Sequence, residues 1–206
     1  MLVTMLTRAL VLALAALLIP ASAAQAQRPS QVVLAIWGLP TRLVGGLEAA
    51  GSYVLLQIPD VRARSDARGA PVPRLAEKWV RSADGKTYTV TLRPAKFQDG
   101  KPVTAEDAKF SFERYRGTAA SAFKSRIAAV EVENHRIRFR LKQPWPDFMT
   151  YYGTPATGAG WVVPKKYLEK VGDEGFKRAP IGAGPYRFVA FNPGVELVLE
   201  ANEQYW

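Results

Sequence analysis

Few side chains in this sequence could take part in catalysis. The chain has no cysteine and a single histidine, His135. It follows Asn134 in a turn-like stretch, and we interpret it as a solvated turn residue, since a structural zinc site needs four nitrogen or sulfur ligands. Glu106 and Asp107 are adjacent carboxylates, but Asp107 stands three residues after Thr104, the spacing of a helix capping box. We therefore expect capping there, and we do not expect an enzyme.

The glycines at 182 and 184 raise the question of a phosphate-binding loop. The segment Gly182-Ala183-Gly184-Pro185 lacks the third glycine of such loops and leads into a strand-like run instead of a helix. Two glycines and a proline are better explained as a rigid lead into that strand. We expect neither a cofactor nor a bound metal.

Aromatic residues beside predicted loops are better candidates for ligand contacts. Each aromatic residue alone is more often part of a core, but several beside loops favour a cleft. This set is Trp37, Tyr53, Tyr151, Tyr152 and Trp161.

The first 26 residues have the pattern of a secretory signal peptide. Arg8 precedes an uninterrupted apolar run over residues 9–19, Pro20 breaks it, and Ala24-Gln25-Ala26 fits a cleavage site. The run is about half of the ~20 residues that a membrane-spanning helix needs. We expect cleavage after Ala26 and a soluble periplasmic protein.

The composition agrees with export. The net charge is +10, yet basic residues are dispersed among acidic ones, so we expect no nucleic-acid partner. Without cysteine there is neither a disulfide nor a lipid-attachment site.

Hydrophobic periodicity predicts alternating strands and helices, an α/β chain. Residues 87–93 alternate apolar and polar side chains, and Asp84-Gly85 predicts a two-residue hairpin turn that joins them to a strand near Trp79. Asp99-Gly100 predicts a second reversal, before a capped helix over 105–115. The other expected elements are a strand at 32–37, a helix over 47–58, a hairpin over 130–141, loops from 144 to 160, a helix after Pro164 that ends before Gly172, and a hairpin around 192–194.

Several ordered motifs resemble one family. "PRLAEKWVRSADGKTYTVTLRPAKFQDGKPVTAEDAKFSFERY" at 73–115, "LKQPWPDF" at 141–148, "VVPKKYLEKVGDEGF" at 162–176 and "IGAGPYRFVAFNPGVELVLEANEQYW" at 181–206 resemble the bacterial extracellular solute-binding proteins of family 5. This family includes the dipeptide- and oligopeptide-binding components of ABC transporters.

The resemblance implies part of a two-lobed periplasmic-binding-protein fold. Residues 27–58 would begin the first lobe, 59–150 would form a subdomain of hairpins and helix, and 151–206 would return to the first lobe. Family members continue beyond this point into a second lobe, so we expect that lobe to be absent and the chain to end early at Trp206. "WGLPTRLVGG" also lacks the Asp-Pro often found after the first strand.

The resemblance also implies a function. We expect a monomeric binding protein that takes up peptides or peptide-like solutes and delivers them to permease subunits in the inner membrane. The expected ligand contacts are Trp37, Gly38, Tyr53, Tyr151, Tyr152, Gly153 and Thr154. An exported interaction or scaffold domain derived from the same fold is the alternative, and an exported hydrolase would need a nucleophile and a base that these residues do not supply.

Overall fold

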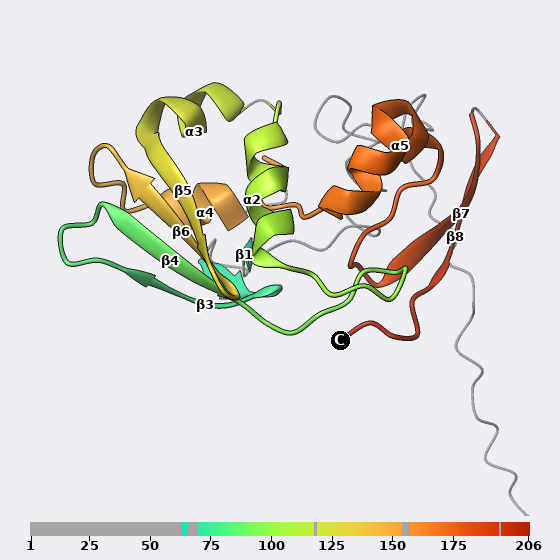
Figure 1. Ribbon diagram of the computed structural model, residues 1–206, viewed down its shortest axis with the longest axis horizontal. Coiled ribbons are helices and arrows are strands. Elements are labelled where there is room, and N and C mark those ends of the chain that lie inside the picture. Colours follow the sequence, from blue (N-terminus) through green and yellow to red (C-terminus); the bar gives the residue numbers. More distant parts are fainter. Residues whose placement is uncertain (1–62, 66–69, 118, 154–156, 194) are drawn as a thin grey trace, which may run out of the picture.

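The computed structural model describes residues 63–65, 70–117, 119–153, 157–193 and 195–206 (Figure 1). The predicted signal peptide, the predicted strand at 32–37 and the predicted helix over 47–58 lie outside these residues. In the part that is described, helices and strands mix, as the sequence predicts. No helix there is long and apolar enough to cross a membrane.

A four-stranded antiparallel sheet forms one end of the molecule. Its order is β3 (Ala76–Arg81), β4 (Thr87–Leu92), β6 (Arg136–Leu141) and β5 (Ile127–Glu133). Tyr88 lies opposite Phe139, and Val90 lies opposite Ile137. Because side chains alternate along a strand, these four residues share one face, and all of them are buried. The predicted alternation over 87–93 and the predicted hairpin over 130–141 are confirmed.

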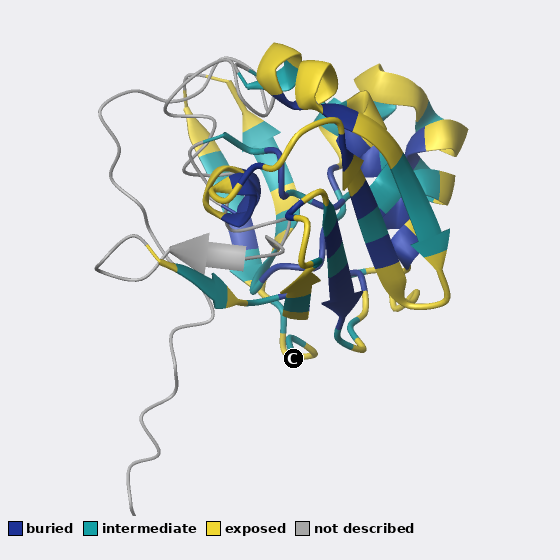
Figure 2. Ribbon diagram, turned by 90° about the vertical axis from the view of Figure 1, so that its left-hand side faces the viewer, coloured by how far each residue is buried: buried dark blue, intermediate teal, exposed yellow. Residues whose placement is uncertain are grey.

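Helices cover this apolar face. They are α2 (Ala105–Arg114), α3 (Ala120–Arg126) and α4 (Phe148–Gly153). The rings of Phe112 and Phe139 meet edge to face with centroids 5.2 Å apart, and Phe123 lies 5.9 Å from Phe112. Figure 2 shows buried positions alternating with more exposed ones along the strands. The core therefore lies between this sheet and its helices.

The helix α4 differs from expectation. The composition between Pro144 and Gly160 predicted loops, but residues 148–153 are helical. Phe148, Met149 and Tyr152 are buried there. Packing of this apolar face, not local propensity, explains the short helix.

The two Asp-Gly turns behave differently. At Asp99-Gly100 the chain reverses as predicted, with the Gly100 amide donating to the Phe97 carbonyl over 2.8 Å and φ of 82° at Gly100. The two-residue turn predicted at Asp84-Gly85 is wrong. Ser82 N donates to Thr87 O over 2.9 Å, so the loop is longer, and only Gly85 of the pair has positive φ. The Asp84 carboxylate accepts from Ser82 Oγ and Lys86 N, which favours this wider turn.

The other end of the molecule contains α5 (Lys165–Arg178) and an antiparallel pair, β7 (Tyr186–Asn192) and β8 (Glu196–Ala201). Figure 1 shows α2 between the four-stranded sheet and α5. The hairpin around 192–194 is confirmed. The helix after Pro164 breaks at Gly172 as predicted, but helical structure resumes beyond it as far as Arg178. A further small pair, β1 (Ala63–Ser65) and β2 (Pro71–Pro73), packs near α4.

Candidate functional site

The helix α4 positions the predicted ligand residues that the structure describes. Tyr151, Tyr152 and Gly153 form its last turn. Two backbone hydrogen bonds start the helix, from Phe148 N to Trp145 O and from Tyr151 N to Asp147 O. The predicted contacts Trp37, Gly38, Tyr53 and Thr154 lie outside the described residues, so the structure brings together only three of the seven.

Tyr152 lies inside the core. Its ring stacks on Phe148 with centroids 5.2 Å apart and an interplanar angle of 13°, and it meets Phe139 at 4.8 Å. The exposed fraction of the residue is 0%, and Gly153 is also buried. A ligand contact by either residue stays a prediction, while packing already accounts for the position of the Tyr152 ring.

Tyr151 points outward and is 51% exposed. Its ring lies 5.7 Å from that of Trp145, and the Arg126 guanidinium covers Trp145 at 4.6 Å. Thr157 Oγ1 donates to the Tyr151 carbonyl over 2.9 Å, which ties the following segment to the helix end. We call Trp145 and Tyr151 the aromatic ledge. An aromatic ring held in this way can stack on an apolar or planar group of a ligand.

Trp161, another predicted cleft aromatic, lies beyond the turn at Gly158. Its amide donates to the Gly158 carbonyl over 3.3 Å. The indole nitrogen is buried and has no hydrogen-bond acceptor among the residues that the structure describes. A donor of this kind is a candidate contact for a ligand oxygen.

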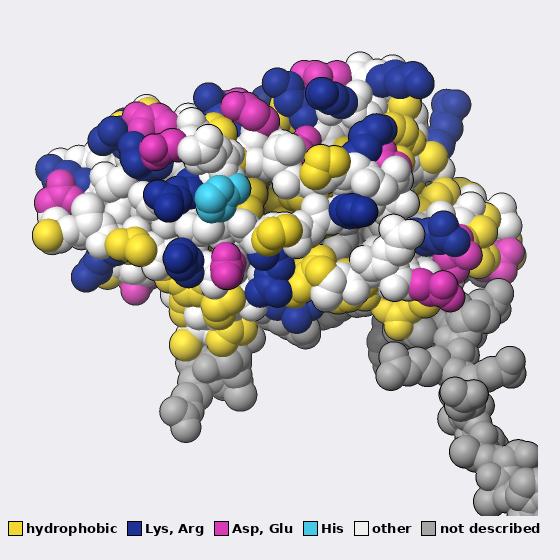
Figure 3. All heavy atoms as spheres, turned by 60° about the horizontal axis from the view of Figure 1, so that its bottom comes forward, with side chains coloured by type: hydrophobic (Ala, Val, Ile, Leu, Met, Phe, Trp, Pro, Cys, Tyr) yellow, Lys and Arg dark blue, Asp and Glu magenta, His cyan; other side chains and the backbone are white. Residues whose placement is uncertain are grey.

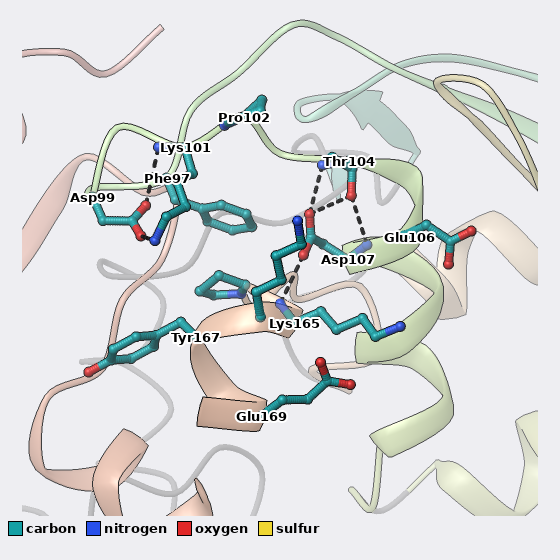
Figure 4. A pocket seen from close by; sticks show the side chains of 12 residues that line it. Phe97, Asp99, Lys101, Pro102, Thr104, Glu106, Asp107, Lys165, Tyr167 and Glu169 are labelled. Carbon is teal, nitrogen blue, oxygen red and sulfur yellow. Dashed lines mark hydrogen bonds and ion pairs between the residues drawn. The ribbon is translucent and has the colours of Figure 1, made fainter. Parts of the chain in front are cut away.

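A cavity of about 340 Å³ lies between the start of α2 and the start of α5 (Figure 4). Phe97, Tyr167 and two prolines supply its apolar wall, and lysines alternate with acids elsewhere. The Lys101 ammonium pairs with Asp99 over 2.7 Å. Because charges of both signs line it, the cavity has no strong preference for an anion or a cation.

Asp107 is the central side chain of this cavity. Its Oδ2 accepts from Thr104 N over 2.9 Å and from Thr104 Oγ1 over 2.6 Å, while Thr104 Oγ1 accepts from Asp107 N. The predicted capping box is thus confirmed. Its Oδ1 accepts from the Lys165 amide over 2.8 Å, at the first residue of α5. One carboxylate therefore caps two helices, and Figure 4 shows both sets of bonds.

The contact with Lys165 could not be found from the sequence. Asp107 and Lys165 are 58 residues apart, and no local spacing signals the bond. Ser111 strengthens the same junction, since its hydroxyl accepts from Val163 N over 2.9 Å.

Gln98 forms a second junction with the C-terminal part. Its amide nitrogen Nε2 donates to Tyr186 O over 2.6 Å, and its Oε1 accepts from Gly182 N over 3.0 Å. The backbone of Gln98 also donates to Gly182 O over 2.9 Å. These bonds hold the glycine-containing segment before β7 in place. Gly182 and Ala183 therefore have a structural role here.

Ion pairs on the exposed face of the sheet join the neighbouring strands β5 and β6. Arg140 Nε lies 2.6 Å from Glu131 Oε1, and Arg138 bonds Glu133 over 2.9 Å. The hydrogen bond from Arg140 lowers the pKa of Glu131, and the charges of Arg140 and Arg138 add to this effect. The same hydrogen bond raises the pKa of Arg140.

Possible metal ligands are dispersed in the described residues. No group of three His, Asp or Glu side chains in this part of the chain could hold a metal ion. His135 is exposed in the turn between β5 and β6.

Comparisons with known proteins agree on one family. Residues 70–206 match the family described as "Bacterial extracellular solute-binding proteins, family 5 Middle". A probable D,D-dipeptide-binding periplasmic protein of Escherichia coli (strain K12), DdpA, is 36% identical over 138 residues, which are 64% of this chain and 26% of that protein.

Solved structures give the same result. AgaA from A. tumefaciens R10, in complex with agropinic acid, has a TM-score of 0.68 and 31% identity over 76% of this chain and 32% of its own. The oligopeptide-binding protein AppA from Bacillus subtilis, in complex with a nonapeptide, has a TM-score of 0.70 and 27% identity, covering 82% of this chain and 35% of its own. The chain thus spans about a quarter to a third of the length of these relatives.

Proposed function

Because the chain belongs to the bacterial extracellular solute-binding proteins of family 5, we propose that it is part of the binding component of an ABC transporter that imports peptides or peptide-like solutes. The match of residues 70–206 to this family is the observation that carries the proposal. The protein acts in the periplasm after its signal peptide is removed, and permease subunits in the inner membrane receive the ligand. It works as a monomeric binding protein and not as an enzyme.

The proposed ligand class follows from the relatives. DdpA is named for a D,D-dipeptide, and the AppA structure holds a nonapeptide. The AgaA structure holds agropinic acid, so the solutes to be tested include this compound beside peptides. The aromatic ledge supports a peptide-like ligand, because an exposed Tyr151 ring can pack on a side chain or on a peptide plane.

The proposed mechanism is closure of two lobes around the solute. A ligand that touches both lobes stabilises the closed arrangement by its extra contacts there, and a hinge absorbs the movement. Trp37, Gly38, Tyr53 and residues 151–154 are the proposed contacts from this chain. The junctions made by Asp107 and Gln98 support the mechanism, since they tie α2 to α5 and the segment before α2 to the start of β7, so that these elements can move as one body.

Isothermal titration calorimetry tests the proposal. The protein, in the longest form that its gene encodes, is titrated with D,D-dipeptides, L-dipeptides, nonapeptides and agropinic acid. We expect one peptide class to bind, and Tyr151→Ala to weaken that binding by about 1 kcal/mol through lost ring contact. Tyr167→Ala, which removes a ring from the cavity between α2 and α5, is the matched control and should leave affinity unchanged.

The outcomes separate the two candidate functions. Peptide binding that Tyr151→Ala weakens and Tyr167→Ala spares supports the proposed transport role. A folded protein that binds none of the solutes supports the exported scaffold domain instead. If Tyr151→Ala and Tyr167→Ala lower the affinity for peptide equally, the aromatic ledge is not part of the ligand site. The proposed transport function would still stand.

A further inference from the structure

Arg126 lies beside the aromatic ledge. It is the last residue of α3, and its guanidinium carbon lies 4.6 Å from the ring centroid of Trp145. The same indole lies 5.7 Å from the ring of Tyr151. Trp145 is only 8% exposed, whereas Arg126 and Tyr151 are both exposed. A cation and an aromatic ring therefore reach the surface next to each other, on a shared indole.

The core holds this indole in place. The Tyr88 hydroxyl donates to the Trp145 carbonyl over 2.9 Å. The rings of Phe123 and Phe148 lie 5.4 Å and 5.7 Å from the Trp145 ring. Because Trp145 is held by these contacts, a guanidinium that stacks on it is already ordered, and ordering it costs less free energy when a ligand binds.

Stacking leaves the hydrogen-bond donors of Arg126 available. A guanidinium contacts an aromatic ring through its flat face, while its N–H groups point outward in the plane of the group and can bind both oxygens of a carboxylate. In the part of the chain that the structure describes, no acid forms an ion pair with Arg126. Arg140, by contrast, pairs with Glu131 over 2.6 Å. Arg126 is therefore the better suited of the two to a carboxylate from outside the chain.

A second basic residue adjoins Arg126. The Lys142 amide donates to the Arg126 carbonyl over 2.9 Å, because Ile127 and Leu141 are opposite each other in the sheet. Lys142 is exposed and forms no ion pair within the described residues. On the face that carries His135, Figure 3 shows basic side chains dispersed among acidic and uncharged ones. A preference for carboxylates is therefore expected from the stacked arginine and its neighbour, and not from net charge alone.

We propose that Arg126 is a specificity-determining residue, which pairs with a carboxylate of the ligand while an adjacent apolar side chain of the ligand packs on Tyr151. This inference rests on the proposed function, in which Tyr151 contacts a peptide. It narrows the ligand class to peptides with a carboxylate next to an apolar residue. The carboxylate comes from the C-terminus of the peptide or from an acidic side chain, since the guanidinium binds both in the same way.

Calorimetric titration with matched peptides tests the inference on the longest form of the protein that its gene encodes. The probes are D-Ala-D-Phe, L-Ala-L-Phe and a polyalanine nonapeptide that ends in phenylalanine, each as the free acid and as the C-terminal amide. A third form of each is amidated and carries glutamate before phenylalanine, so that it offers a side-chain carboxylate alone.

The measured quantity is the ratio of the affinities for the carboxylate form and the plain amide. We expect a ratio of at least about five for the parent protein, and Arg126→Gln should reduce it to below about two. Lys124→Gln removes another exposed charge of α3 and should leave the ratio unchanged. A general loss of stability in Arg126→Gln would lower both affinities together and would not change their ratio.

The outcomes separate this inference from the proposed function. If acids and amides bind equally well, or if Arg126→Gln and Lys124→Gln change the ratio equally, Arg126 does not select the ligand, while peptide binding itself stands. Absence of binding by every peptide contradicts both. Tighter binding of the free acid assigns the carboxylate to the peptide end, and tighter binding of the glutamate form assigns it to a side chain.

A second variant decides if Arg126→Gln does not fold. Arg126→Lys keeps the positive charge and loses the planar donor fork. We expect it to lower the ratio by at least about twofold. An unchanged ratio in Arg126→Lys would overturn the proposed pairing.

Discussion

Asp107 shows what a single residue does for this protein. The capping box with Thr104 can be predicted from a spacing of three residues, because both partners belong to one helix start. The bond to Lys165 joins two helices and depends on how they pack, so the sequence does not reveal it. A hydrogen bond between residues close in sequence can thus be predicted, whereas a hydrogen bond to a residue of another helix cannot.

Replacing Asp107 with asparagine turns one of its acceptor oxygens into a donor that faces other donors. We expect the free energy of unfolding to fall by about 1–2 kcal/mol. Glu106→Gln, in the same first helical turn but exposed, should change it by less than about 0.5 kcal/mol. Urea denaturation of both variants measures the difference, and equal effects would show that Asp107 acts only through its charge near the helix end.

Glu131 provides a prediction about pH. Its pKa is lowered in the folded state by the hydrogen bond from Arg140. The ionised Glu131 therefore stabilises the folded state at pH values above its ordinary pKa of 4.5. This contribution to the free energy of unfolding is lost as pH falls through the lower pKa of the folded state. Glu131→Gln should flatten the acid side of the stability profile, whereas Glu169→Gln, an exposed acid outside this pair, should leave its shape unchanged. An NMR titration that finds the Glu131 pKa at or above 4.5 would contradict this explanation.

The elements differ in how far the sequence predicts them. Strand β4 and helix α2 follow from alternation and capping, which are properties of contiguous residues. The composition around helix α4 favoured a loop. The segment is helical because Phe148 and Tyr152 pack against Phe139 on the buried face of the sheet. The turn at Asp84 is wider than a two-residue hairpin because its side chain bonds Ser82 and Lys86. In both places, packing or side-chain hydrogen bonds stabilise a structure that differs from the one that the local sequence favours.

Gly172 gives a prediction for α5. Its φ of 69° and ψ of 178° interrupt the helix, and apart from the adjoining backbone no atom of the described residues lies within 4 Å of the place that a Cβ would take. The cost of Gly172→Ala is therefore one of backbone conformation alone, about 1–3 kcal/mol. Lys170→Ala, on the exposed side of the same helix, should be neutral or slightly stabilising. Thermal melts of the two variants measure this, and a Gly172→Ala protein as stable as the parent would show that α5 can straighten without loss.

At the scale of the whole molecule, the family could be predicted from the sequence. Of the predicted ligand residues, only some lie in the part of the chain that the structure describes. The ordered motifs from residue 73 onward led to family 5, and the match over 70–206 confirms it. Of the seven predicted ligand residues, the structure places Tyr151 at the surface and Tyr152 in the core, although the two are neighbours in sequence. Loop position alone cannot separate them, because the side a residue faces is decided by the helix that forms there.

We propose that this protein binds a peptide or a peptide-like solute, and ligand-induced thermal stabilisation tests this proposal most directly. A ligand at about 100 times its Kd stabilises the folded state by about 2.7 kcal/mol, which raises Tm by roughly 5–10 °C for a protein of this size. We predict such a rise with at least one of the D,D-dipeptides, L-dipeptides and nonapeptides. A cooperative melt whose Tm is the same with every peptide would contradict the account.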